Sequence, residues 1–425
     1  MRLTDKEFAS RHKLHMSDFT RIRKLDFVSV FLLILRSSVK SLQNVLNEFV
    51  LHLKLQYTIT SSAFTQARKK LSHTAFIELN DHTVSFYFRD DDIRRLRGFR
   101  CLGVDSSLVI LPNTKEIREA FGTVSINRGD GKDLGCYAAA KFQCCYDVLN
   151  RIAVKTSFSP GKGYEVDLAI EMLPNLTSRD LLIFDRGYAS YKMLASLVKA
   201  GVSYVVRCPR NSFKVTESLF AGKGPNSIVA TLAAHKSQKK YLEKLGLPNN
   251  ILVRFVSVLL STGEIEVLAT SLMDTKETTF TPDFFKEVYC LRWGVESFFG
   301  IIKGRLALEN FTGKTVESVK QDFWSAILIS NMETIMTEDI ERELNEDLED
   351  NQPIKKINKS VSFNALKNMA FELFYEKDTD YAVDQLTKLF SMNTLTQRKH
   401  RVVPRREASA KRSLNFHKRF KKQVF

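Results

Sequence analysis

The chain has 425 residues, of which 44% are hydrophobic, and a formal net charge of +16 with a pI near 9.4. This length can bury a large core over about two to four domains. The positive charge favours a polyanionic partner, although a merely basic soluble protein has the same composition. The longest apolar run, residues 27–35, is far shorter than the roughly 20 residues of a membrane span and lies too far along the chain for a secretory signal.

The six cysteines form no CxxC pair and no Cys/His cluster with zinc spacing. We therefore expect reduced core thiols in a cytoplasmic protein, associated with the nucleoid if the polyanionic partner is DNA.

The first 95 residues are predicted to form a helical DNA-binding domain. Residues 24–49 alternate apolar and basic positions at helical spacing. Residues 61–71 (SSAFTQARKKL) follow a Thr/Ser-rich turn and begin with serines suited to an N-cap. This helix carries Arg68, Lys69 and Lys70 and would suit recognition of the major groove. A packing helix with a solvated basic face fits the same residues.

Strands and helices alternate in the next part of the chain. The predicted elements are strands over residues 100–111, 135–147 and 151–158, a helix over 164–173, a strand over 180–185, a helix over 191–200 and a strand over 202–207. The order β-β-β-α-β-α-β predicts an α/β three-layer domain.

Short alternating segments over residues 211–279 predict an inserted, mainly β subdomain. Pro282 then begins a helix that continues through residues 289–303 (YCLRWGVESFFGIIK). Further helices are predicted over residues 316–348 and 364–389. The tail, residues 398–425, has eleven Lys and Arg against one Glu and is predicted to bind phosphate backbone, or to be a disordered solubilising tail.

The helix over residues 289–303 separates polar from apolar side chains. On a helix that advances about 100° per residue, one sector of roughly 60° collects Tyr289, Arg292, Glu296 and Lys303. The opposite side collects an apolar stripe, Leu291, Val295, Phe298 and Ile302. Gly300 lies on the polar side, where a missing side chain lets a bulky partner approach. A surface helix with solvated charges has the same composition.

Three acids are expected to converge. Asp105 lies in the first strand, Asp185 lies at the carboxyl end of a strand in the parallel part of the sheet, and Glu296 projects from the late helix. An acid in a core strand is costly unless it is paired or binds a metal. Three close carboxylates repel each other, and Mg²⁺ or Mn²⁺ relieves that repulsion with oxygen ligands.

Such a site would suit phosphoryl transfer. Two ions about 3.5–4 Å apart would activate a water or a 3′-hydroxyl. Tyr289, Arg292 and Lys303 would hold the phosphates that flank the scissile bond.

The spacing Y-x2-R-x3-E-x6-K, with Asp105 in GVDSS and Asp185 in DRGY, resembles the IS4 family of DDE transposases. The resemblance covers residues 95–310 and implies an RNase H-like catalytic domain with a β-rich insertion between the second Asp and the Glu. It implies that Asp105, Asp185 and Glu296 are catalytic and bind Mg²⁺ or Mn²⁺. It also implies a homodimer that cuts both ends of an insertion sequence at its terminal inverted repeats and joins the 3′ ends to target DNA.

Arg207 and Arg210 follow the strand after Asp185 and are predicted to contact the DNA end, although a solvated basic loop fits as well. Some family members stack a flipped base on a Trp of the insertion. The two tryptophans of this chain, Trp293 and Trp324, lie outside it, and Trp293 is expected to pack. Whether another aromatic residue replaces it stays open, with the candidates Phe213, Tyr241 and Phe255.

The predicted domains are residues 1–95, helical and DNA-binding; 96–210 and 280–315, the two parts of the RNase H-like core; 211–279, the β-rich insertion; 316–397, helical; and 398–425, the basic tail. Two other functions fit the same residues. One is a structure-specific RNase H-like DNA nuclease without strand transfer, and the other is a catalytically silent DNA-binding regulator.

Overall fold

The computed structural model describes residues 3–21, 23–36, 40–89, 92–127, 133–260, 262–273, 279–349, 352–374 and 379–397. The predicted basic tail, 398–425, lies outside the described residues. The chain divides into two units. Unit 1 comprises Met1–Asp90, Val109–Ala140 and Gly300–Phe425, and unit 2 comprises Asp91–Leu108 and Lys141–Phe299.

Unit 2 is built on a mixed sheet in the order β3-β1-β5-β6-β9-β8-β7, with β4 paired to β3. The parallel neighbours are β1 (Arg100–Ile110), β5 (Asp180–Phe184) and β6 (Ser203–Cys208). The antiparallel strands that follow in the sheet are β9 (Ile265–Thr270), β8 (Asn250–Leu259) and β7 (Ser227–Ala233). The hairpin at the other edge is formed by β3 (Asp133–Asp147) and β4 (Ile152–Pro160), and parts of β1 and β3 belong to unit 1.

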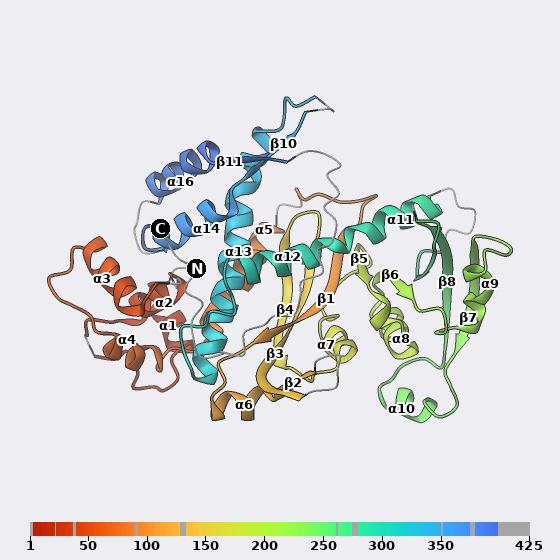
Figure 1. Cartoon of the computed structure of the whole chain (residues 1–425), viewed down its shortest axis with the longest axis horizontal. Helices are drawn as coiled ribbons and strands as arrows, with labels where there is room; N and C mark the ends of the chain where they lie inside the picture. Colours follow the sequence, from red (N-terminus) through yellow and green to blue (C-terminus); the bar gives the residue numbers. More distant parts are fainter. Residues whose placement is uncertain are drawn as a thin grey trace. The chain divides into compact units, whose positions relative to one another are not determined.

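Alternate residues of these strands are buried on opposite faces of the sheet. On one face, Leu182 and Phe184 pack with α7 (Glu165–Glu171) and α8 (Tyr191–Ala200). On the other face, Leu181 and Ile183 pack with α11 (Pro282–Leu291). Figure 1 shows α8 and α11 on opposite sides of the strands. The predicted three-layer α/β arrangement is confirmed.

The predicted β insertion does not form a sheet of its own. β9 pairs antiparallel with β6, with Leu268 opposite Arg207, so β9, β8 and β7 extend the main sheet. The predicted insertion, residues 211–279, thus contributes its strands to the main sheet. The pairing satisfies backbone groups that would otherwise be exposed at the edge of β6. Residues 211–279 also contain η2 (Lys214–Thr216), α9 (Glu217–Phe220) and α10 (Lys239–Lys244). A further short helix, η1 (Arg186–Tyr188), follows β5.

Unit 1 is mainly helical, at the beginning and at the end of the chain. Its elements are α1 (Lys6–Arg11), α2 (Phe27–Leu35), α3 (Leu42–His52), α4 (Ser61–Arg68), α5 (Thr74–Tyr87), α6 (Lys115–Phe121), β2 (Thr123–Asn127), α13 (Val316–Glu343), β10 (Ile354–Ile357), α14 (Lys359–Asn368), α15 (Ala370–Phe374), α16 (Asp380–Met392) and β11 (Thr394–Gln397). The long helix α13 packs against α2, α5, α14 and α16.

Two predictions for unit 1 are corrected, and two elements were missed. The predicted helix over residues 364–389 is divided among α14, α15 and α16. The cap of α4 is Thr60, whose Oγ1 accepts a hydrogen bond from the Ala63 N–H at 3.2 Å, rather than a serine. The elements α6 and β2 were not predicted. Among the described residues, no helix combines the length and the apolar character needed to cross a bilayer.

Candidate active site

The helix that carries the Y-x2-R-x3-E-x6-K pattern divides at Arg292. α11 ends at Leu291 and α12 spans Trp293–Gly304, which corrects the prediction of one continuous helix. Arg292 keeps helical dihedral angles, φ −51° and ψ −34°, and its N–H donates to the Tyr289 carbonyl at 3.1 Å. Tyr289 and Arg292 therefore lie at the end of α11, whereas Glu296 lies in the first turn of α12.

The start of α12 packs closely against the turn after β3. A Cβ added at Gly294 would lie 3.0 Å from Cγ1 of Val148, in the turn after β3, and a Cβ at Gly103 on β1 would lie 3.1 Å from the same atom. The two glycines therefore let the start of α12 and β1 approach one turn. Val295 and Phe298 are buried, which confirms the predicted apolar stripe at these positions.

The register of the sheet places the two aspartates beside each other. Val104 on β1 pairs with Phe184 on β5, and the next residues along these parallel strands are Asp105 and Asp185. Glu296 is linked to Asp105 through one guanidinium nitrogen of Arg292. Arg292 Nη1 lies 2.9 Å from Glu296 Oε1 and 3.6 Å from Asp105 Oδ2. The three predicted acids therefore lie near one another, beside the carboxyl end of β5.

The remaining contacts of Asp185 come from two predicted site residues. The Tyr289 hydroxyl donates a hydrogen bond to Asp185 Oδ1 at 3.0 Å. Arg207 Nη1 lies 3.7 Å from the same oxygen. Tyr289 is 7% exposed and Arg292 is 3% exposed, so both polar groups are held in the interior by these carboxylates.

The two aspartates have opposite electrostatic environments. Burial, helped by the charges of Glu296 and Asp185 and opposed by the Ser106 N–H and Arg292, raises the pKa of Asp105 to about 6. For Asp185, burial also favours protonation, but the Arg186 N–H, Arg292 and the Tyr289 hydroxyl outweigh it and lower the pKa. Asp185 therefore stays ionised at a lower pH than Asp105.

A fourth carboxylate, Glu266 on β9, was missed by the sequence analysis. Its Oε1 lies 2.7 Å from Arg207 Nη2, so Arg207 connects Glu266 to Asp185. Glu266 is 9% exposed, and burial raises its pKa. An acid within an apolar strand was the signal that identified Asp105, and the same signal was present in IEVLAT.

The other predicted contacts lie as follows. Lys303 belongs to unit 1, where its Nζ lies 3.8 Å from Glu309 Oε1. Arg210 is exposed, with its guanidinium 5.9 Å from the centre of the Phe220 ring. Trp293 was expected to pack, but it is 49% exposed and lies beside Arg292, whose guanidinium is 4.6 Å from its ring.

The three aromatic candidates of the β-rich segment also differ. Phe255 is fully buried, and Phe213 packs on it with ring centroids 5.5 Å apart. Tyr241 is 51% exposed. Of these three, Tyr241 is therefore the ring that a base could reach without repacking of the core.

Arg68 on α4, a predicted DNA contact, is buried in the structure. It is 5% exposed because it faces inward with Phe64, one helical turn away. Its guanidinium donates to Gln321, Thr312 and Asp322 at 2.6, 2.6 and 2.7 Å, in a network within unit 1. Lys69 is exposed and Lys70 is half-buried, so both remain candidates for the predicted contact.

The donor set suits a hard divalent cation by type, because all three predicted ligands are carboxylates. The raised pKa of Asp105 reflects burial first and the charges of Glu296 and Asp185 second, and a bound cation would favour the ionised carboxylate against both. Within the described residues, however, no three Asp, Glu, His or Cys side chains are grouped so that they could hold one ion. Arg292 lies between Asp105 and Glu296 instead. A shared ion therefore requires the Glu296 carboxylate to turn away from Arg292.

Residues 98–332, more than half of the chain, match the family described as a transposase DDE domain. The chain therefore belongs to the DDE transposase family, and Asp105, Asp185 and Glu296 all lie inside the matched region. It is similar to the transposase InsG for insertion sequence element IS4 of Escherichia coli K12, with 24% identity over 277 residues. The match covers 64% of this chain and 60% of that relative, and it supports the predicted membership of the IS4 family.

Proposed function

We propose that this protein is a catalytically active DNA transposase with an RNase H-like core. It binds the terminal inverted repeats of an insertion sequence, cleaves the DNA ends and joins the 3′ ends to target DNA. The observation that supports this proposal is the grouping of Asp105, Asp185 and Glu296 around Arg292 and Tyr289, in a chain of the DDE transposase family.

Asp105, Asp185 and Glu296 would hold Mg²⁺ or Mn²⁺. When bound, the metal activates the attacking oxygen and stabilises the leaving oxygen in phosphoryl transfer. Tyr289 orients Asp185 and favours its ionised form through the 3.0 Å hydrogen bond. The pKa of Asp105 near 6 means that its ligand form is fully populated only above about pH 7.

Arg292 has a second role in this proposal. In the structure its buried charge is compensated by Asp105 and Glu296. Once the acids turn to a metal, the guanidinium becomes available for a phosphate oxygen of the bound DNA, which it binds with charge-assisted hydrogen bonds. Arginine suits this exchange because it stays charged in either environment.

The DNA partners follow from the same proposal. The net charge of +16 favours a polyphosphate surface. Lys69, Lys70, Arg210 and Lys303 are proposed to hold the duplex, and Arg207 to contact the DNA end once it leaves Glu266. Two copies of the chain are proposed to act on the paired ends as a homodimer.

The test uses a Glu296→Gln variant and a DNA duplex that carries the element's terminal repeat. Strand cleavage in the presence of Mg²⁺ should be abolished, whereas binding of the duplex in a gel-shift assay should persist. Glu287→Gln is the matched control, because Glu287 is an exposed acid on α11. Cleavage by Glu296→Gln at the wild-type rate contradicts the proposal.

Two further outcomes with the wild-type protein favour the alternative functions. Cleavage without joining of precleaved ends to target DNA favours a structure-specific nuclease. Duplex binding with no nicking in Mg²⁺ or Mn²⁺ favours a silent DNA-binding regulator.

A further inference from the structure

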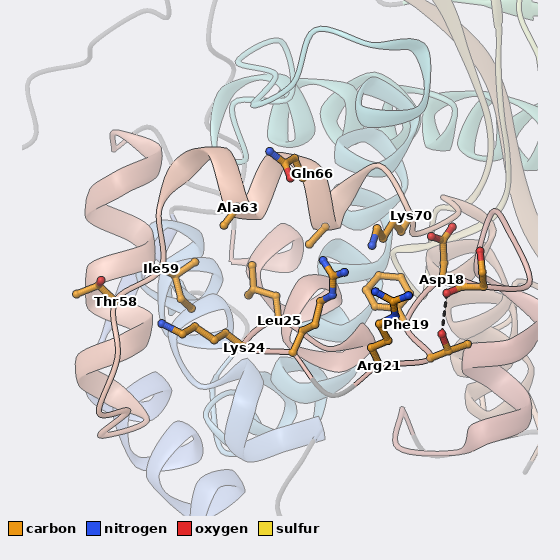
Figure 2. Close-up of a pocket in the computed structure, with 14 residues that line it drawn as sticks. Asp18, Phe19, Arg21, Lys24, Leu25, Thr58, Ile59, Ala63, Gln66 and Lys70 are labelled. Atoms are coloured by element: carbon orange, nitrogen blue, oxygen red, sulfur yellow. Dashed lines mark hydrogen bonds between the residues drawn. The ribbon is translucent and has the colours of Figure 1, made fainter.

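A cavity of about 610 Å³ lies in unit 1 between α4 and the segment that precedes α2. Its wall on one side is the face of α4 that carries Ala63 and Gln66, and Figure 2 shows these two residues across the cavity from Leu25, Lys24 and Arg21. The volume falls within the range of roughly 300–1,000 Å³ that is common for small-molecule sites. None of the residues discussed for the candidate active site in unit 2 lines it.

The cavity carries an excess of positive charge. The cationic side chains in its lining are Arg21, Arg23, Lys24 and Lys70. Among the described lining residues, Asp18 has the single carboxylate, and its Oδ2 already accepts a hydrogen bond from the His15 N–H at 3.0 Å. In the described parts of the chain, no carboxylate pairs with Arg21, Arg23 or Lys70. Their charges therefore favour an anionic ligand.

The two most buried side chains of the lining are apolar. Leu25 and Ile59 are 7% and 2% exposed, whereas Arg21, Arg23 and Lys24 are exposed. The cations thus form a rim above a hydrophobic floor, and the Gln66 amide adds a donor and an acceptor at the wall. A phosphate group alone would compensate the cations of the rim and would leave the apolar side chains of the floor without a contact. A ligand with both an anionic and a flat apolar part fits the whole cavity.

The backbone of the lining segment is strained where it turns past the cavity. Phe19 has φ +54°, in the left-handed region that a bulky side chain rarely adopts. Its ring packs edge-on against Phe27 of α2, with centroids 5.6 Å apart, which holds this conformation. Such strain concentrates at ligand sites, because the surrounding packing must maintain it.

We propose that this cavity binds a nucleoside phosphate. Arg21 and Arg23 hold the phosphate, and the base lies on the floor formed by Leu25 and Ile59. Two sources supply this chemistry, a free mononucleotide or an unpaired nucleotide of a DNA strand. A base inside an intact duplex cannot enter the cavity, because it is stacked and paired on all sides.

The first experiment measures binding to the full-length protein by calorimetry, with dAMP, deoxyadenosine and inorganic phosphate as separate probes. A fluorescent single-stranded hexamer and its duplex are measured by anisotropy. If the free nucleotide is the ligand, dAMP binds at least about tenfold more tightly than deoxyadenosine or phosphate, because both parts contribute. If the strand is the source, the hexamer binds and dAMP does not.

Two variants separate shape from charge. Ala63→Trp fills the cavity without removing a charge, and Arg23→Gln removes one exposed cation without filling it. Each should weaken binding of dAMP or of the hexamer by about tenfold and leave duplex binding within twofold. Lys6→Gln, an exposed cation on α1 outside the cavity, is the matched control.

Three outcomes overturn the proposal. One is the absence of binding by both dAMP and the hexamer. Another is unchanged affinity in the folded Ala63→Trp and Arg23→Gln variants, and a third is competition by inorganic phosphate as strong as that by dAMP. None of these outcomes bears on DNA cleavage by the acids of unit 2, so the two proposals fail independently.

Discussion

Replacing Asp105 by Asn should make the metal-free protein more stable at neutral pH while it abolishes cleavage. A pKa that burial raises from 3.8 to about 6 corresponds to a cost of roughly 3 kcal/mol for keeping the Asp105 carboxylate ionised in the folded state. The folded protein binds this proton more tightly than the unfolded chain does. The cost is therefore absent below about pH 4 and develops fully as the pH rises through about 6.

The assay is urea unfolding of wild type and Asp105→Asn in EDTA at pH 4 and pH 7.5. The difference in free energy of unfolding between the variant and the wild type should shift by about 3 kcal/mol in favour of the variant from the lower to the higher pH. Comparing two pH values cancels any constant effect of the amide. Glu287→Gln should show no such change, because Glu287 is exposed.

Added Mg²⁺ gives a second measurement on the same proteins. It should stabilise the wild type by an amount that grows with concentration, and it should stabilise Asp105→Asn much less. A difference between variant and wild type that does not depend on pH would refute the assignment of an unfavourable buried charge to Asp105. Equal stabilisation of both proteins by Mg²⁺ would refute its role as a ligand.

Three further predictions follow from contacts in the structure. Arg68→Ala should lower the free energy of unfolding by about 3–5 kcal/mol, because it leaves the buried Asp322 without its ion pair. The control Lys69→Ala should change the free energy of unfolding by less than about 0.5 kcal/mol. Equal effects of the two variants in urea titrations would contradict the burial of Arg68. Tyr289→Phe removes a hydrogen bond that lowers the pKa of Asp185. The rate of cleavage should therefore fall about tenfold at neutral pH, and the acid limb of its pH profile should move to higher pH. A rate and a pH profile like those of the wild type would show that the hydroxyl is dispensable. Glu266→Gln frees Arg207 from its 2.7 Å ion pair, so we expect binding of the DNA end to strengthen by about tenfold in this variant and the gain to be absent when Arg207→Gln is added; unchanged affinity of Glu266→Gln in gel-shift titrations would show that Glu266 does not hold Arg207 away from the DNA.

Local signals determined how well individual elements were predicted. The helix over residues 191–200 was predicted with its observed bounds, because Ser190 caps its start and Gly201, at φ +66°, ends it. The strands that carry Asp105 and Asp185 were recognised because each is an apolar run interrupted or ended by an acid. Signals of this kind lie within a few residues of the element that they specify.

Features that depend on distant residues were not predictable in the same way. Arg68 was predicted to contact DNA, because its ion-pair partner Asp322 lies 254 residues away and the local sequence does not reveal it. The break at Arg292 lies two residues before Gly294, whose close approach to Val148 no helical periodicity reports. Glu266 was overlooked although its strand carries a local signal, because its link to Asp185 through Arg207 depends on the pairing of β9 with β6. Tertiary packing overrode local pattern at each of these positions.

Because the helix divides at Arg292, the acids and the arginine of the site contact one another in the interior. Tyr289 at the end of α11 reaches Asp185, whereas Arg292 at the junction reaches both Asp105 on β1 and Glu296 on α12. Moving the three carboxylates together without this guanidinium would leave their charges uncompensated in a buried place. In the proposed function, a bound cation would take over the compensation of charge that this guanidinium provides in the structure. Arg292 would then be available to bind a phosphate oxygen of the DNA.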